Sequence, residues 1–230
     1  YKAAPMPVAA TLAGVTKKVG IYAIVRVYFT VLGNTTVSVN MPFVPGSGGS
    51  PLAFLAPVLL AMAVLSIFVG GFGALNADRL DGLLAYSSIG QVGFIAAPVA
   101  VAAGASSASL RRLGILAALV YALHHALTKG LLFLSSGVVR DTAGTTRISE
   151  VGGLGQLSSP FTVVFLVGSL SLIGIPPLAG FFGKLFVFNV AVRNLVASTG
   201  IGGAGVLAVL LLGAFLTILY STRAWSSMIW

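Results

Sequence analysis

The stretch SLIGIPPLAGFFGK, residues 171–184, decides how this sequence can fold. It lies within an apolar run from about 160 to 196, which is longer than one plain membrane crossing of about 20 residues. Pro176 and Pro177 remove two consecutive backbone hydrogen-bond donors from this run. The interior of a helix does not absorb that loss without a break.

We therefore predict a discontinuous helix, with half-helices over 160–175 and 178–197 that meet near the middle of a membrane. Gly174 and Gly180 flank the proline pair and belong to the predicted break. Irregular backbone at that depth is tolerated only where protein or a water-filled cavity surrounds it. Broken helices of this kind mark ion or substrate sites in transporters. The alternative is a single long, tilted helix with a proline kink.

The composition of the whole chain excludes an ordinary soluble protein. Of the 230 residues, 57% are hydrophobic and only 7% are charged, whereas soluble domains carry about 25% charged residues. We predict an all-α, polytopic protein of the cell membrane, surrounded by the lipid bilayer. It has about six transmembrane helices, one of them broken at Gly174–Pro177. The six apolar stretches run over 5–32, 51–75, 83–103, 110–139, 160–196 and 205–230.

The charge of the chain is strongly positive, with 13 Lys and Arg against four acids and a formal net charge of +9. The basic residues are scattered among apolar segments, so we expect no nucleic-acid partner. Without cysteine there is no disulfide framework and no thiolate metal site. The glycine-rich stretches lack the strand–turn–helix setting of a nucleotide-binding loop. We therefore expect no metal and no cofactor. The sequence also contains no serine-nucleophile motif that would indicate an enzyme.

The start of the chain and the charges between the apolar segments indicate how the sequence belongs to a longer protein and how it is oriented in the membrane. The chain begins at Tyr1 without an initiator Met or a signal-peptide pattern, so we interpret it as a piece of a longer membrane protein. The loops on the N-terminal side carry more basic residues, including Arg79, Arg140 and Arg147. The positive-inside rule then places that side in the cytoplasm.

Basic residues inside the apolar segments are the candidate functional residues. Each costs at least about 2.5–3.5 kcal/mol at the centre of a membrane helix, and such residues usually face the bundle interior and mark ion or proton pathways. Lys17 and Lys18 point about 100° apart, so at most one of them is expected to face such a pathway. Snorkelling to the interface is the alternative, more so for Lys17. Arg26 lies two turns beyond Lys18 on nearly the same face, with snorkelling to the far interface as its alternative.

The fourth crossing contains HHALTK, in which His125 and Lys129 are four residues apart and share one helix face. Because a histidine gains or releases a proton near pH 7, this pair can form a proton relay, while His124 points elsewhere. Histidines that hydrogen-bond across helices are the alternative. Lys184 is a further candidate, about two turns into the second half-helix. No acid lies inside a crossing, so a cation site would need carbonyls, hydroxyls such as that of Ser87, or carboxylates from elsewhere.

Five motifs follow one another along the chain: YKAAPMPVAATLAGVTKKVGIYAIVR, LLAYSSIGQVGF, HHALTKGLLFLSSG, TAGTTRISEVGGL and SLIGIPPLAGFFGK. In this order they resemble the proton-translocating antiporter family. That family comprises the large subunits of Mrp-type sodium/proton antiporters and the related membrane-arm subunits of respiratory complex I. The details are most similar to the D subunits of Mrp antiporters, and the resemblance covers nearly the whole chain.

The resemblance implies a fold of about fourteen transmembrane helices with two inverted five-helix repeats, each containing one broken helix. This chain would run from the eighth helix to the thirteenth. Residues 1–35 would be the last helix of the first repeat, and residues 51–230 the second repeat. The resemblance also implies a relay of buried lysines and histidines along the membrane midplane. Its members would be Lys18 on the eighth helix, His125 and Lys129 on the eleventh, and Lys184 on the broken twelfth.

Two features of this sequence depart from the family pattern. The family usually has a basic pair before the LAYSS-type motif, where this sequence has Leu80-Asp81-Gly82, so no contact of that pair is carried over. The family's fifth-helix glutamate and its seventh-helix lysine partner would lie upstream of Tyr1. We therefore do not expect residues 1–230 to transport ions by themselves.

The resemblance implies an ion-translocating subunit of a multisubunit antiporter, with protons and a monovalent cation, sodium favoured, as the ions and the other subunits as partners. The alternative is a proton-pumping membrane-arm subunit of an NADH:quinone oxidoreductase or a membrane-bound hydrogenase complex, in which the same residues would serve. A third hypothesis, a scaffold subunit, is disfavoured because an apolar residue would be cheaper in lipid than a retained lysine.

Overall fold

The residues that the computed structural model describes are 4–34, 51–151, 160–197 and 202–229. These segments are helical almost throughout, and their only strand-like pairing is an isolated antiparallel bridge between Arg79 and Arg147. Six of the described helices are long and apolar enough to cross a membrane. The expected all-α, polytopic class is therefore confirmed. Some predicted segments lie outside the described residues. They are the first three residues, most of the connection between the first two apolar stretches (33–50), and the GGLGQLSS segment at 152–159.

The first crossing is one continuous rod from Met6 to Val31 whose winding changes along its length. Two π-helical turns interrupt it, and π-helical turns occur frequently at functional sites. The lysine pair lies at the start of the α-helical part that follows the first of these turns. The successive parts are α1 (Met6–Thr11), η1 (Leu12–Thr16), α2 (Lys17–Arg26), η2 (Val27–Val31) and the 3-10 turn η3 (Leu32–Asn34).

The next two helices, α3 (Pro51–Leu75) and α4 (Leu80–Gly104), form an antiparallel hairpin. Glycines let the two backbones approach closely. A Cβ on Gly93 would press on the backbone carbonyl of Ala63, and small residues permit such packing in membranes. Because α4 also contacts α5, α7 and α8, it is the most buried of the six spans.

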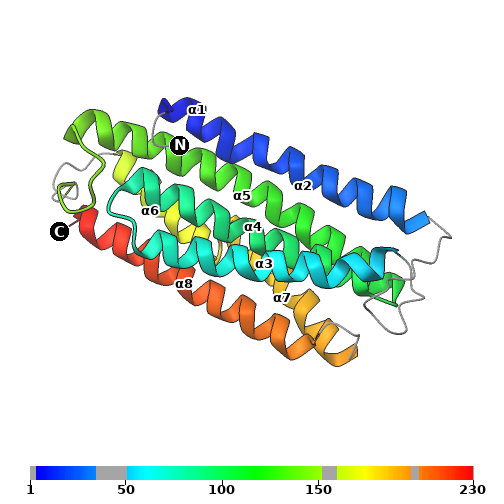
Figure 1. Ribbon diagram of the computed structural model, residues 1–230. Helices are drawn as coiled ribbons and strands as arrows, with labels where there is room; N and C mark the ends of the chain where they lie inside the picture. The colour runs from blue at the N-terminus through cyan, green and yellow to red at the C-terminus, as the bar shows by residue number, and fades with distance from the viewer. Residues whose placement is uncertain (1–3, 35–50, 152–159, 198–201, 230) are drawn as a thin grey trace.

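The long helix α5 (Ala108–Ala143) runs beside the first crossing and also contacts α4, α6 and α7 (Figure 1). It ends at Gly144, whose φ of 70° is the left-handed conformation that commonly terminates helices. The fourth apolar stretch was predicted over 110–139, so that Arg140 and Asp141 would follow its end. That boundary is wrong: both residues lie inside α5, because nothing before Gly144 stops the helix.

The predicted half-helices are α6 (Pro160–Ile173) and α7 (Ala179–Ala197), separated by residues 174–178. The chain therefore has a true break here, and the kinked single helix is excluded. With 14 residues, α6 is shorter than the full crossing of about 20 residues. The last helix, α8 (Gly203–Ile229), packs against α3, α4, α6 and α7.

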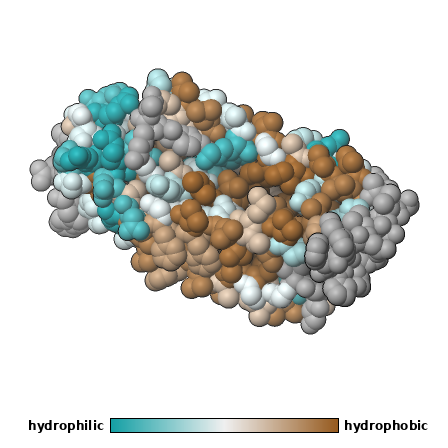
Figure 2. All heavy atoms as spheres, in the orientation of Figure 1, coloured by the Kyte–Doolittle hydropathy of each residue, from teal (hydrophilic) through white to brown (hydrophobic). Residues whose placement is uncertain are grey.

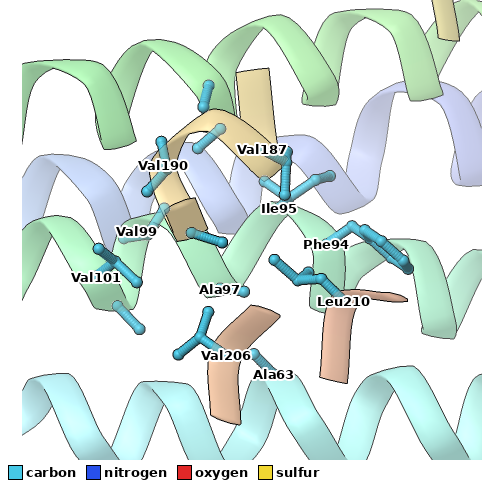
Figure 3. Close-up of a cluster of buried hydrophobic side chains, with 14 of the residues drawn as sticks. Ala63, Phe94, Ile95, Ala97, Val99, Val101, Val187, Val190, Val206 and Leu210 are labelled. Atoms are coloured by element: carbon cyan, nitrogen blue, oxygen red, sulfur yellow. The ribbon is translucent and has the colours of Figure 1, made fainter. Parts of the chain in front are cut away.

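The core of the bundle gathers around α4, and Figure 3 shows side chains of α7 and α8 meeting those of α4 there. Apolar side chains also cover the outside of the helices, whereas hydrophilic residues gather at one end of the molecule (Figure 2). Leu127 and Val196 are 67% and 80% exposed. Large exposed apolar surfaces of this kind mark membrane or protein contacts. The core residues in Figure 3 include Ala63, Phe94, Ile95, Val99, Val187, Val190, Val206 and Leu210.

Candidate functional site

The break between α6 and α7 begins with a Schellman motif at the end of α6. Gly174 has a φ of 92°, a conformation that glycine adopts without steric cost. Its N–H donates to the carbonyl of Ser171 at 3.1 Å, and the N–H of Ile175 donates to the carbonyl of Leu170 at 3.1 Å. These two hydrogen bonds define the motif. The proline pair then follows and prevents the helix from continuing.

Gly180 allows the first turn of α7 to approach both α6 and α5. A Cβ at this position would overlap the backbone carbonyl of Ser171 and would lie 2.9 Å from Cε1 of His124. Gly183, almost one turn further along α7, would bring a Cβ to 3.1 Å from Cδ2 of Tyr121. These two glycines therefore bring the buried side chains of α5 next to the break.

Lys184 places its ammonium group at the end of α6. The residue is 6% exposed, and its Nζ donates at 2.6 Å to the carbonyl of Ile173, the last residue of α6. The last carbonyls of a helix lack an intrahelical partner and carry its partial negative charge. Nζ also lies 5.6 Å from the centre of the Phe94 ring on α4, within cation–π range. The break thus provides cation-binding groups that a continuous helix would not expose.

Lys129 is fully buried where α5 contacts α4, with 0% of the residue exposed. Its Nζ donates to the carbonyl of Leu84 at 3.2 Å and to the hydroxyl of Ser87 at 2.5 Å. The neighbouring Ser88 hydroxyl donates to the carbonyl of Leu84 at 2.8 Å. The predicted hydroxyl of Ser87 therefore binds a lysine, and the groups that hold this ammonium are neutral oxygens.

His125 lies on the same face of α5 as Lys129, as the spacing predicts. It is 0% exposed, and neither ring nitrogen has a hydrogen-bond partner among the described residues. His125 is close enough to Lys18, Lys129, His124 and Lys17 for their charges to interact. A buried imidazole without fixed partners can exchange a proton with neighbouring groups on either side.

His124 faces the break instead. Its ring stands edge-on to the Tyr121 ring, with centroids 5.6 Å apart, and its Nδ1 lies 3.2 Å from Oγ1 of Thr128. The Thr128 hydroxyl in turn lies 3.5 Å from the hydroxyl of Ser171 near the end of α6. His124 is also close enough to Lys184 for their charges to interact. The structure therefore brings His124, which was expected to point away from the His125–Lys129 pair, next to the broken helix.

The basic residues of the first crossing have different surroundings. Lys18 lines a groove of about 360 Å³ beside α5, and its Nζ donates to the carbonyl of Ala13. Lys17 lines a second groove, of about 280 Å³, beside α3 and α4. Both lysines are half-buried, whereas Arg26 is exposed. Lys18 is thus the one that lies on the α5 side, where His125 is found.

A hydrogen-bonded network beside the break was not predicted from the sequence. The side-chain amide of Gln91 on α4 donates to Oγ1 of Thr217 at 3.1 Å and to the hydroxyl of Tyr220 at 2.9 Å, both on α8. The hydroxyl of Tyr121 on α5 donates to Oε1 of Gln91. Tyr121 also stacks on Phe94, with the ring centroids 5.8 Å apart. This contact holds in place the Phe94 ring that faces the ammonium group of Lys184. The sequence feature that could have predicted this network is Gln91 in an apolar helix, since a buried amide is costly unless it is paired.

The fold and the site define a polytopic helical membrane protein with a broken helix and with buried lysines that form no ion pair among the described residues. Residues 1–211 match the family described as NADH:quinone oxidoreductase/Mrp antiporter, transmembrane. The chain belongs to this family. The resemblance stated from the five motifs is therefore confirmed.

The similar proteins come from both branches of the family. The chain is 33% identical over 194 residues to the D subunit of the Na(+)/H(+) antiporter of Alkalihalophilus pseudofirmus, covering 84% of this chain and 34% of that protein. It is 34% identical over 225 residues to the N subunit of the NADH-quinone oxidoreductase of Desulforudis audaxviator, covering 97% of this chain and 39% of that protein. A chain in the structure of the Mrp complex from Dietzia superposes with a TM-score of 0.78 at 25% identity, covering 97% of this chain and 36% of that chain. The sequence thus spans little more than a third of the length of these proteins.

Proposed function

We propose that the chain is part of a proton- and cation-translocating subunit of a multisubunit Na+/H+ antiporter in a cell membrane. Lys18, His125, Lys129 and Lys184 form its proton relay. The observation that carries this proposal is how the two most buried lysines are paired. Among the described residues neither Lys129 nor Lys184 forms an ion pair with a carboxylate. A buried charge without a counter-charge is costly, and inside a membrane such a residue indicates an ion pathway.

His124 extends the proposed relay from the break to α5. Lys129 lies on the α4 side of α5, and Lys184 lies at the break. Next to the break, His124, Thr128 and Ser171 place an imidazole and two hydroxyls in succession from α5 to α6. Each of these groups both donates and accepts hydrogen bonds. In the proposed relay this series carries a proton from the Lys184 side to α5, the helix that also carries Lys129.

Electrostatic repulsion supplies the coupling between the members of the relay. Two like charges about 6–10 Å apart repel by roughly 1.5–3 kcal/mol at an effective dielectric constant of about 20. An energy of that size shifts a protonation equilibrium by about one to two pH units. Protonation of one member therefore favours release of the proton from the next.

The test replaces Lys129 or Lys184 with Ala in the full-length protein and measures sodium-dependent proton exchange in everted membrane vesicles. Either substitution removes one proton-carrying group, so we expect exchange to fall to the background level. Arg112→Ala on α5 and Arg193→Ala on α7 are the matched controls, because both residues are exposed and lie on the same helices. Wild-type exchange by either lysine variant, at wild-type protein levels, would refute the relay.

The second candidate function is a proton-pumping subunit in the membrane arm of a redox complex. It is favoured by the similarity to the N subunit of an NADH-quinone oxidoreductase, and the same lysines would serve in it. Isolation of the intact protein with its native partners distinguishes the two functions. Small membrane subunits of an antiporter support the first, and iron–sulfur or quinone-site subunits support the second.

A further inference from the structure

A polar cavity lies at the end of the bundle where the α3–α4 turn, the segment after α5 and the last turns of α8 come together (Figure 1). Hydrophilic residues gather at this end of the molecule (Figure 2). The cavity has a volume of about 480 Å³, within the usual range of small-ligand sites. Its lining consists of Asp78, Arg79, Arg147, Ile148, Ser149, Arg223 and Ser227.

Backbone hydrogen bonds place two of these arginines opposite each other. The N–H of Leu80 donates to the carbonyl of Thr146 at 2.8 Å, and the N–H of Ile148 donates to the carbonyl of Asp78 at 2.9 Å. These bonds make Arg79 and Arg147 partners in an antiparallel bridge. Like charges directly opposite each other destabilise such a pairing. The ion pairs of the two side chains with Asp81 and Glu150 offset part of that repulsion, and an anion between the two guanidinium groups would offset more of it.

The intramolecular partners leave most of the guanidinium donors available. Arg79 contacts Asp81 through Nε at 3.2 Å, and Arg147 contacts Glu150 through one terminal nitrogen at 3.4 Å. The third arginine, Arg223 of α8, donates through one terminal nitrogen to the carbonyl of Leu75. Since each guanidinium has five donors, most of them have no partner among the described residues. The lining itself holds three cations and a single carboxylate.

We propose that this cavity binds a phosphate-bearing anion, either the headgroup of an anionic lipid or a soluble phosphate. Planar guanidinium groups match the oxygen spacing of phosphate, and the hydroxyls of Ser149 and Ser227 add donors at the cavity wall. The site also lies at the level of a membrane surface, because Arg223 is in the last turns of the α8 span, which ends at Ser227. Basic pockets at this level between transmembrane helices bind lipid headgroups.

The test measures binding to the full-length protein purified in a zwitterionic detergent. Phosphatidylglycerol, phosphatidylcholine and inorganic phosphate are titrated separately, and the thermal unfolding midpoint is followed. We expect a saturable rise with phosphatidylglycerol or with inorganic phosphate, and none with phosphatidylcholine. Saturation by the lipid but not by phosphate assigns the site to a headgroup, and saturation by phosphate assigns it to a soluble anion.

Arginine variants show whether the binding occurs in this cavity. Arg147→Gln combined with Arg223→Gln should weaken binding at least tenfold. Arg147→Gln alone tests the same point without disturbing a helix contact, because its side chain is 62% exposed. Arg112→Gln, near the opposite end of α5, is the matched control and should bind as wild type. Equal affinity of wild type and the Arg147 variants, or no saturable binding of either anion, overturns the proposal. The result leaves the lysine relay untouched, since no relay residue lines this cavity.

Discussion

The two most buried lysines are held by neutral groups rather than by carboxylates. Lys129 donates to a carbonyl and a hydroxyl of α4, and Lys184 donates to the last carbonyl of α6 above an aromatic ring. Neutral partners stabilise an ammonium less than a carboxylate does. A carboxylate would hold the proton in place. These surroundings therefore suit lysines that gain and lose a proton during turnover.

Ser87 and Ser88 offer a test of the Lys129 site at the scale of one hydroxyl. Hydrogen bonds to charged groups contribute about 1.5–3 kcal/mol, and only Ser87 of the two accepts one from Lys129 in the structure. We expect Ser87→Ala to lower sodium-dependent proton exchange about tenfold, and Ser88→Ala to leave it within twofold of wild type. Both rates are measured in vesicles that contain equal amounts of protein. Identical rates for the two variants would show that this hydroxyl has no role in transport.

Single residues could be selected from the sequence by one rule. A charged residue inside an apolar helix is costly, so it is expected to have a functional role. The rule finds Lys129 and Lys184, and the structure places both in the interior. It does not find Tyr121, whose ring and hydroxyl join the two sides of the site. An aromatic residue is ordinary in an apolar helix, so the sequence alone carries no signal of its contacts. Whether these residues form a relay stays a prediction.

The broken helix depends on glycine where its two halves meet. A Cβ on Gly180 would overlap the carbonyl of Ser171, and backbone cannot give way as a flexible side chain can. Overpacking of this kind costs about 1–3 kcal/mol. We expect Gly180→Ala to lower the thermal unfolding midpoint of the full-length protein by several degrees.

Gly130→Ala is the matched control for this prediction. It adds the same methyl group to a membrane helix at a position where no heavy atom other than those of the adjacent residues and the surrounding backbone of the same helix lies within 4 Å of the new Cβ. Alanine also has the higher intrinsic helix propensity, so its midpoint should equal or exceed that of wild type. If both variants unfold at the same temperature, α6 and α7 do not pack as described.

Element boundaries were predicted best where the chain contains a strong stop signal. The proline pair fixed the break to within two residues on each side. Gly144 was the true stop of α5, but the charged pair before it drew the predicted end several residues too early. The π-helical turns of the first crossing had no sequence signal. They change hydrogen bonding without changing the apolar pattern on which the prediction relied.

At the scale of the whole molecule, Gln91 connects three helices through its side chain. Replacing it with Leu removes the hydrogen-bond partner of the Tyr121 hydroxyl and one of the two partners of the Tyr220 hydroxyl, and a buried unpaired group costs about 1–3 kcal/mol. We expect Gln91→Leu to lower the unfolding midpoint clearly. The double variant with Tyr121→Phe should lose less than the two single variants together, because it removes both partners of one bond. Strictly additive losses would contradict the network.

The overall architecture was the most predictable level, because length and apolar content leave few alternatives for a chain of this kind. Six spans and one break follow from where the apolar runs and the prolines stand. The contacts among the helices did not follow, since they depend on which faces meet. The polar motif at the start of α4 illustrates this. Asp81, for which no contact was carried over, accepts hydrogen bonds from Arg79 and Thr146 and so joins the first turn of α4 to the segment after α5. The division into two inverted repeats stays a prediction.

The length of α5 has a consequence for the direction of ion movement. Its 36 residues span about 54 Å, well beyond the hydrocarbon thickness of about 30 Å. His125 is the eighteenth of these residues, so it lies at the midpoint of the rod. The proposed relay therefore includes a histidine that is equally far from the two ends of α5. The helices packed against α5 differ, because the first crossing is continuous whereas α6 and α7 are separated by a break. We expect any directionality of the proposed relay to arise from this difference between the neighbouring helices rather than from the position of His125 along α5.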